Sequence, residues 1–469
     1  MTFWIIVFFA IFIGMLAIAS YKSYSKNRTA DEFMFAGSSI GAILGFLTFA
    51  AALFSAFTFM GMPDFFRVHG IGAWIFLAFS DGFMVFFIIW FGYKLRKRAH
   101  QLGYNGVAGM MAQSYQMRIT GYLVFLSAFI FLVPYVAIQI RGISIFLNAA
   151  FPDLMPSWSW SVGIVIMMLI YAEIGGLKAI VFSDAIQGLL LLLVIWIIGI
   201  ACLNMSGGMT AMFESVGNTQ PALLSLPGPK GLFNTQFLIA SVIAIVLIPV
   251  TQPQFTTRLV VMKDLKSVHT MAYAVGFFAI LVILPTAFIG MYGAIKYPEA
   301  STSDFLSSAL LYDQADPVAA LAITGLFAAC LSTTNAQIFA LGTELRSLLS
   351  GEEKTIMRYT KISLLVFSVI VLIFSTFMSN ELAMLARVSF TGTSMIAPIV
   401  LGAVIFKNPP KALVYLSGIA FFIFLLSLLE VVPSMLGTYR LDFVMYIALA
   451  LFTTIIILIH QKSTAIHED

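Results

Sequence analysis

Charged residues are scarce in this sequence: Asp, Glu, Lys and Arg together make up 10% of its 469 residues. A chain with so few charges and with 61% hydrophobic residues cannot hide its apolar surface inside one water-soluble core. The scarcity of charge therefore excludes a soluble domain as the main body of the chain and predicts a protein of the lipid bilayer. The net charge of +4 is too small to predict a nucleic-acid partner.

Cysteine is almost absent. Cys202 and Cys330 are the two cysteines of the sequence, and both lie inside apolar stretches, which excludes a disulfide framework and a zinc cluster. The loops contain no His, Cys, Asp and Glu grouping at metal-ligand spacing and no nucleophile triad. We therefore expect neither an enzyme activity nor an organic cofactor.

Long apolar stretches dominate what is present. A membrane-spanning helix needs about 20 apolar residues, and the pattern predicts an all-α polytopic membrane protein with about 13 transmembrane helices. Residues 1–469 then form a single transmembrane domain with almost no room for a soluble one. The predicted spans are 3–20, 41–65, 71–93, 119–149, 159–175, 183–204, 235–256, 268–295, 315–347, 360–378, 382–406, 411–430 and 441–460.

Two of the predicted spans contain helix-breaking residues. Gly61 and Pro63 interrupt the second span, and Pro249 and Pro253 interrupt the seventh. Unwound backbone at membrane depth is tolerated only where it is buried in protein or lines a wet cavity, and there its freed carbonyls bind ions and solutes. Paired broken helices therefore predict a transporter with a binding site near the membrane midplane.

The two interrupted spans occupy matching places in the chain. Each opens a set of five spans, at 41–204 and at 235–406. Because five is odd, the second set enters the membrane from the opposite face, which is the relation between the halves of an inverted-repeat transporter. Residues 3–20 add one helix before the repeats, and residues 411–460 add two helices after them.

Basic residues are distributed unevenly between the two predicted faces. If the first span runs inward, all but six of the 25 Lys and Arg residues, Arg258 included, fall on the cytoplasmic side. Because cytoplasmic loops are rich in Lys and Arg, we expect a multi-pass protein of the cell (inner) membrane with an outside N-terminus, a cytoplasmic C-terminus and an uncleaved first span. The six exceptions are Arg67, Arg141, Lys230, Lys296, Arg387 and Arg440.

The ninth predicted span carries small and hydroxyl side chains on one face. Ala329, Ser332 and Thr333 stand at i, i+3 and i+4 in GLFAACLSTTNAQ, so they share one side of a helix. Two hydroxyls and a main-chain carbonyl are neutral oxygens, the ligand type that a hard cation such as Na⁺ accepts. Close packing of two helices through small residues is the alternative interpretation.

Three segments together resemble the sodium:solute symporter family: this A-x-x-S-T face, GGLKAIVFSDAIQG and ADEFMFAGSSIG. The resemblance covers essentially the whole chain, and the family includes bacterial proline, sugar, sialic acid and pantothenate symporters. It implies a LeuT-type five-plus-five architecture with Na⁺ as the coupling ion, held between the first broken span and the ninth span. Matched residue by residue, the implied sodium ligands are Ala51, Phe54, Ala329, Ser332 and Thr333.

Asp184 in FSDAIQG matches a family aspartate that joins a second sodium site in some members. It is therefore a candidate second cation site or proton site, and a helix N-cap at the membrane end is the alternative. The two-sodium members resemble one another in carrying hydroxyls one turn further along the ninth span. This chain has Asn335 and Ala336 there, so we expect one sodium ion per cycle.

Polar side chains within apolar spans outline a candidate substrate pocket. Buried amide and phenol groups are costly unless they meet a partner, so either a solute or an interhelical hydrogen bond must satisfy them. The segment QPQFTTR resembles the family's proline-transporter motif, but Ile245, Ile248 and Pro249 replace the upstream aromatic residues, which argues against proline and sugars. The candidate substrate residues are Thr58, Tyr135, Gln139, Gln252 and Thr391, with Arg141 as a candidate anion partner.

These features predict a sodium-coupled secondary active symporter that imports a small polar or anionic organic solute by alternating access. Two alternatives stay open: a proton-coupled transporter of the same fold, and a transporter-like solute sensor without productive transport. We expect a functional monomer whose partners are the small-molecule solute, sodium ions and the lipid bilayer.

Overall fold

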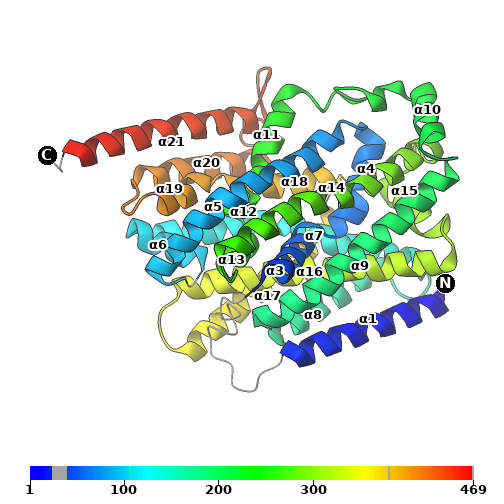
Figure 1. The fold of residues 1–469 in the computed structure, drawn as a ribbon, viewed down its shortest axis with the longest axis horizontal. Helices are drawn as coiled ribbons and strands as arrows, with labels where there is room; N and C mark the ends of the chain where they lie inside the picture. Colours follow the sequence, from blue (N-terminus) through cyan, green and yellow to red (C-terminus); the bar gives the residue numbers. More distant parts are fainter. Residues whose placement is uncertain (24–39, 105, 175, 379–380, 467–469) are drawn as a thin grey trace.

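The computed structural model describes residues 1–23, 40–104, 106–174, 176–378 and 381–466 as a bundle of helices running along one direction (Figure 1). The two chain termini lie at opposite ends of the bundle. The segment ADEFMFAGSSIG falls almost wholly outside the described residues.

The elements are α1 (Thr2–Ser23), α3 (Ala42–Leu53), α4 (Ala56–His69), the π-helical turn η2 (Ile75–Phe79), α5 (Ser80–Leu102), α6 (Val107–Tyr115), α7 (Arg118–Ala150), α8 (Ser157–Ile174), α9 (Gly176–Met205), α10 (Met209–Thr219), the 3-10 turn η3 (Pro221–Leu224), α11 (Thr235–Val246), α12 (Ile248–Thr251), α13 (Pro253–Val260), α14 (Leu265–Lys296), α15 (Thr302–Ser307), the π-helical turn η4 (Ser308–Tyr312), α16 (Asp316–Leu348), α17 (Glu353–Phe377), α18 (Leu382–Ser394), α19 (Ala397–Ile405), α20 (Ala412–Leu428), the strands β1 (Met435–Leu436) and β2 (Tyr439–Arg440), and α21 (Leu441–Ile466).

The apolar helices confirm the predicted all-α membrane class. In the described part of the chain, 7 helices are long and apolar enough to cross a membrane, or up to 9 if each of two bent pairs forms one span. Shorter apolar helices lie within α1, α8, α11 and α20. Each predicted span overlaps one of these helices or helix pairs. The total of thirteen crossings stays a prediction, because four of the helices are short.

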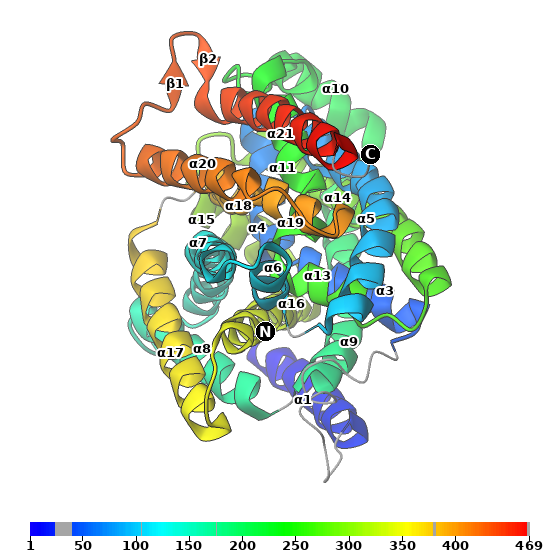
Figure 2. The same cartoon turned by 90° about the vertical axis from the view of Figure 1, so that its left-hand side faces the viewer.

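The helices form an inner and an outer set (Figure 2). Viewed toward one end of the bundle, α4, α13 and α16 lie toward the middle, whereas α1, α17 and α21 lie along the outside. In the apolar stretch of α16, 78% of the residues are buried, against 28% in α17 and 17% in α21. The inner helices therefore provide a protein-lined interior in which polar groups are shielded from lipid.

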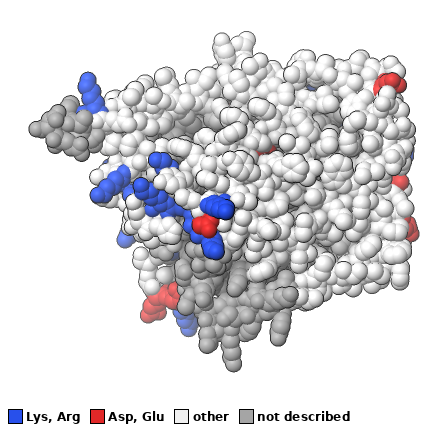
Figure 3. All heavy atoms as spheres, in the orientation of Figure 1, with Lys and Arg blue, Asp and Glu red and all other residues white. Residues whose placement is uncertain are grey.

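Surface charge differs between the two ends of the bundle. On the face drawn in Figure 3, most of the visible Lys and Arg side chains gather toward the end where the C-terminus lies, whereas acidic side chains are visible at both ends. An asymmetry of this kind is expected of a protein whose basic loops stay on one side of a membrane.

The first broken span bends by 54° between α3 and α4. The break falls at Phe54 and Ser55, which have extended backbone angles. Ser55 then begins α4 through a capping box: its hydroxyl accepts from the Phe57 N–H at 3.1 Å, and the Thr58 hydroxyl accepts from the Ser55 N–H at 3.1 Å. These two bonds satisfy donors that a helix start leaves open, so the break forms without glycine or proline.

The prediction that Gly61 and Pro63 form this break is wrong, because both lie inside α4. Their role is packing. A Cβ on Gly61 would lie 2.3 Å from a ring carbon of Phe57. The carbonyl oxygen of Pro63 approaches Gly290 of α14 so closely that a Cβ there would lie 2.6 Å from it and 2.5 Å from the Cβ of Phe66. Only glycine lets α14 pass α4 at this separation.

The second broken span consists of α11, α12 and α13. Its interruption at Gln252 (φ −99°, ψ 120°) directly precedes Pro253, as the sequence predicts. Proline disfavours helical angles in the residue before it and needs no N–H partner at the first position of a new helix. A further bend of 44° separates α18 from α19, near Pro398, in a span that the sequence analysis treats as continuous.

The contact between α4 and α14 is tested by Gly290→Ala. The added methyl overlaps backbone atoms of α4, and overpacking of this kind costs about 1–3 kcal/mol. We expect a lower apparent melting temperature of the purified protein in detergent. Gly163→Ala on the exposed face of α8, where a Cβ meets nothing within 4 Å, is the matched control: it has the same gain in helix propensity without the overlap and should not lower the melting temperature. Equal melting temperatures for both variants would contradict the close packing.

Candidate functional site

A group of neutral oxygens lies where α3 reaches the first break. The Thr333 hydroxyl of α16 donates to the carbonyl oxygen of Ala51, and the Ser332 hydroxyl oxygen lies at the same distance of 3.3 Å from it. In an unbroken helix this carbonyl would accept from the Ser55 N–H, which instead donates to the Thr58 hydroxyl. The break therefore frees an acceptor, and two hydroxyls from a neighbouring helix turn toward it.

The other two predicted sodium ligands lie beside this group along the same helices. Phe54 is the first residue after α3 and Ala329 lies one turn before Ser332, and both are buried. No described group donates to the Phe54 carbonyl, because the Thr58 N–H bonds to the carbonyl of Ser55 instead. Hydrogen bonds thus join Ala51, Ser332 and Thr333 directly, and an open carbonyl stands next to them.

Asp184 joins the same group from α9. Its Oδ1 accepts from the Ser332 hydroxyl at 2.7 Å, and its Oδ2 accepts from the Thr48 hydroxyl at 2.6 Å. The side chain is fully buried, and α9 begins eight residues earlier, at Gly176. Asp184 is therefore not a helix cap at the membrane end.

Arg258 of α13 forms a buried ion pair with Asp184, with 2.7 Å between Nη2 and Oδ2. Its Nε donates to the carbonyl and the hydroxyl of Thr48, and its Nη1 donates to the Gln254 carbonyl at 2.8 Å. Arg258 is only 2% exposed and lies within α13, so it belongs to the second broken span and not to the loop that follows it. The ion pair connects the second broken span to α3 and α9 at the sodium candidates.

This arrangement has a chemical consequence for Ser332. A hydroxyl binds a cation through an oxygen lone pair, so its hydrogen must point to another acceptor. Asp184 supplies that acceptor, and a hydrogen bond of this kind fixes the orientation of a metal ligand. Because Arg258 balances the charge of Asp184, the oxygens around Ala51 present no net charge. Such a group suits a monovalent cation that is bound weakly and released.

Tyr135 and Gln139 of α7 pair with the freed backbone of the first break. The Tyr135 hydroxyl donates to the Leu53 carbonyl at 3.0 Å. The Gln139 side chain accepts from the Ala56 N–H at 2.9 Å and donates to the Ser55 hydroxyl at 3.2 Å. For Tyr135 and Gln139 this is the interhelical hydrogen bonding that the sequence left open as the alternative, and Thr58 supports the break within its own helix through the capping box.

Gln252 and Thr391 lie elsewhere in the interior. The Gln252 amide, at the second break, donates to the Thr393 hydroxyl of α18 at 3.4 Å. Thr391 is buried on the same helix and lies beside Tyr446 of α21, whose hydroxyl also contacts the Ser394 hydroxyl at 2.6 Å. Next to Thr391 on α18, Phe390 packs its ring against Tyr135 with the centroids 5.3 Å apart. Helix α18 therefore contacts residues of both breaks.

Asp81 of α5 is a candidate that the sequence analysis did not single out. It lies on the buried face of its helix with Met84 and Ile88 and is 6% exposed. It forms no hydrogen bond or ion pair with any described residue, and it interacts electrostatically with Tyr135. An unpartnered carboxyl in a membrane span is a functional candidate by default. The sequence signal was one acid within the apolar run FLAFSDGFMVFF.

Solved structures share this architecture. The fold is similar to that of a Na⁺-coupled sialic acid symporter in a substrate-bound outward-open state, with a TM-score of 0.73, 17% identity, and 96% of this chain and 95% of that chain covered. It is also similar to Mhp1, a nucleobase-cation-symport-1 family transporter in a closed conformation with bromovinylhydantoin bound (TM-score 0.64, 13% identity, 92% and 95% covered). These likenesses show that the chain has the helical fold of such membrane transporters.

The chain belongs to the sodium:solute symporter family, whose model matches residues 33–411. Two relatives are sodium/pantothenate symporters. The protein from Haemophilus influenzae is 24% identical over 341 residues, which cover 71% of this chain and 69% of the relative. The protein from Escherichia coli K12 is 23% identical over 331 residues, which cover 69% and 67%.

The buried ion pair is tested by a double-mutant cycle. Asp184→Asn or Arg258→Gln alone leaves one charge buried without its partner, which destabilises a protein by about 3–5 kcal/mol. We expect each single variant to melt at a lower temperature in detergent, and the double variant to lose less than the two single losses added together. Strictly additive losses would show that the two side chains act independently.

Proposed function

We propose that this symporter imports a small polar or anionic organic solute together with one sodium ion by alternating access. The observation that carries the proposal is the pair of α16 hydroxyls, Ser332 and Thr333, turned toward the freed Ala51 carbonyl of α3. The sodium ligands we assign are these three residues with the carbonyls of Phe54 and Ala329. Membership of the family supports sodium as the coupling ion.

Coupling follows from which helices supply the oxygens that bind sodium. The ion would bridge α3, which ends at the first break, to the unbroken helix α16, and so favour the conformation in which the two helices are close. A solute that binds the same conformation gains affinity from the ion, and the ion gains the same factor from the solute. The affinity for sodium then also depends on the position of α13. Arg258 of α13 pairs with Asp184, and Asp184 accepts a hydrogen bond from the sodium ligand Ser332.

The energetics of one sodium ion are sufficient. Moving one charge across 100 mV releases about 2.3 kcal/mol, and a tenfold concentration gradient adds about 1.4 kcal/mol. Their sum, about 3.7 kcal/mol, would hold a neutral solute at about 500-fold accumulation. A single-ion cycle is supported by Asp184, whose oxygens already accept from Thr48, Ser332 and Arg258.

Two observations support the class of solute: the substrates for which the relatives are named, and the polar residues of the interior. The relatives are named for pantothenate and the structural neighbour for sialic acid, and both compounds are organic acids. In the interior, Gln252 lies at a break and Thr391 is buried on the neighbouring helix α18, so these two residues are the substrate candidates we retain. We further infer a functional monomer in the cell membrane with its N-terminus outside, which the uneven surface charge supports (Figure 3).

The sodium assignment is tested by Ser332→Ala and Thr333→Ala. Each removes one ligand oxygen, so we expect the sodium concentration for half-maximal solute uptake in proteoliposomes to rise several-fold. Thr324→Ala is the matched control, because this buried threonine of the same helix bonds only to its own backbone at Ala320. Unchanged sodium dependence in both Ser332 and Thr333 variants would remove the site.

Asp81 favours one rival function, a proton-coupled transporter of the same fold. With Asp184 paired to Arg258, Asp81 is a described carboxyl of the interior that has no hydrogen-bond or ion-pair partner and is available to carry a proton. If protons drive uptake, transport survives in sodium-free buffer, collapses with a protonophore and is lost in Asp81→Asn. If sodium drives uptake, as we expect, uptake by the unaltered protein requires sodium and Asp81→Asn leaves the half-maximal sodium concentration unchanged.

A further inference from the structure

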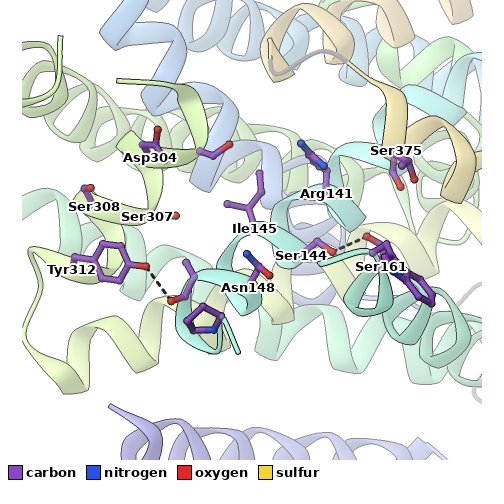
Figure 4. A pocket seen from close by; sticks show the side chains of 15 residues that line it. Arg141, Ser144, Ile145, Asn148, Ser161, Asp304, Ser307, Ser308, Tyr312 and Ser375 are labelled. Atoms are coloured by element: carbon purple, nitrogen blue, oxygen red, sulfur yellow. Dashed lines mark hydrogen bonds between the residues drawn. The ribbon is translucent and has the colours of Figure 1, made fainter. Parts of the chain in front are cut away.

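A polar cavity of about 460 Å³ opens between α7, α8, α15, η4 and α17 (Figure 4). None of its lining residues belongs to the sodium group or to either break. Pockets of this volume suit small organic ligands. Trp158 and Tyr312 stand at its wall with most of their surface exposed, as aromatic residues do at the depth of lipid headgroups. Both a dissolved solute and a lipid headgroup can reach such a place.

Arg141 brings an unbalanced positive charge to this cavity. Its Nε is buried without a hydrogen-bond partner, and its guanidinium forms no ion pair within the described ranges. The one acid of the described wall, Asp304, is exposed and accepts from the Ser301 hydroxyl at 2.7 Å. Figure 4 shows Ile145 between Arg141 and Asp304. A guanidinium on a membrane-spanning helix without a counter-charge favours an oxyanion ligand, which it binds in a fork geometry.

The hydroxyls of the wall divide into two kinds. Three of them donate their hydrogens to carbonyls of the protein: Tyr312 to that of Ala149, and Ser375 and Thr376 to that of Leu372. Their oxygens keep lone pairs and therefore accept from hydroxyl groups of a ligand. By contrast, Ser307 and Ser308 make no side-chain hydrogen bond to described residues. These two, with the Asn148 amide, supply further donors to the same cavity.

We propose that this cavity binds an oxyanion that also carries hydroxyl groups. The carboxylate or phosphate group pairs with Arg141, and the ligand's hydroxyls donate to the oxygens of Tyr312, Ser375 and Thr376. That the cavity holds the transported solute rests on the proposed function. That the cavity binds an oxyanion does not rest on it. Binding is measured without a sodium gradient, so failure of sodium coupling and failure of this site are separate results.

The test measures protection of one introduced cysteine from a thiol reagent. Cys202 and Cys330 are both fully buried, so Ser308→Cys on the cavity wall provides the reactive thiol. Gluconate is the probe, because it carries one carboxylate and several hydroxyls. Sorbitol at equal concentration and chloride at equal ionic strength are the ligand controls. We expect gluconate alone to slow labelling of Cys at 308 several-fold in purified protein.

Arg141 variants decide whether the protection arises from the charge. Arg141→Gln in the Ser308→Cys background should abolish protection, and Arg141→Lys should keep part of it. Arg118→Gln, at the opposite end of α7, is the matched control and should leave protection intact. Ser225→Cys, in an exposed loop away from the cavity, should label at the same rate with and without gluconate. A melting temperature for each variant shows that it is folded.

A lipid arm identifies the source of the oxyanion. Phosphatidylglycerol, whose headgroup carries a phosphate and two hydroxyls, is added to the protein in maltoside micelles, with a neutral glycolipid as control. Arg141-dependent slowing by phosphatidylglycerol supports a lipid oxyanion, and Arg141-dependent slowing by gluconate supports a dissolved one. The proposal is overturned if neither probe slows labelling more than its neutral control, or if Arg141→Gln protects as well as the unaltered arginine.

Discussion

The break between α3 and α4 is the constraint on which the site depends. Interrupting a helix inside a membrane frees main-chain groups that have no water to pair with. The freed groups are shared between two neighbouring helices: Ala51 accepts from the Thr333 hydroxyl of α16, Leu53 accepts from the Tyr135 hydroxyl of α7, and Ala56 donates to Gln139 of α7. The break therefore holds these helices together, and the same pairing leaves carbonyl oxygens facing a protein interior. A cation site of neutral oxygens is a direct result of that pairing.

The charges beside the break explain how a weak cation site coexists with a buried carboxylate. A carboxylate among the sodium oxygens would bind an ion tightly and oppose its release. Arg258 instead forms an ion pair with Asp184, and the hydroxyls of Ser332 and Thr48 donate to its carboxylate oxygens. The pair costs desolvation energy, which three further hydrogen bonds from Arg258 help to offset. Asp184 thus orients a sodium ligand while its charge is already balanced.

The sequence predicted what depends on local pattern and missed what depends on distant partners. Spans and the shared face of Ser332 and Thr333 follow from helical spacing. The first break was misplaced, because glycine and proline are local signals, whereas the true break rests on the Ser55 capping box and on side chains of α7. Arg258 was misassigned for the same reason: its partner Asp184 lies 74 residues away. Asp81 was visible as an isolated acid in an apolar run, and that signal was overlooked.

The placement of the two broken spans suggests how movement would reach the ion. Helix α13 carries Arg258 and begins at Pro253. Among the described residues, the backbone hydrogen bonds that link α12 to α13 all involve Gln252 itself. A hinge needs residues that absorb a change of backbone angles, and the pre-proline residue Gln252 is already in an extended conformation. If α13 turned at this point, Arg258 would leave Asp184, and the carboxylate would lose its balancing charge next to Ser332. The electrostatic environment of the Ser332 hydroxyl would then differ, so the affinity of the site for sodium would change with the position of α13. That dependence of affinity on conformation is what coupling requires.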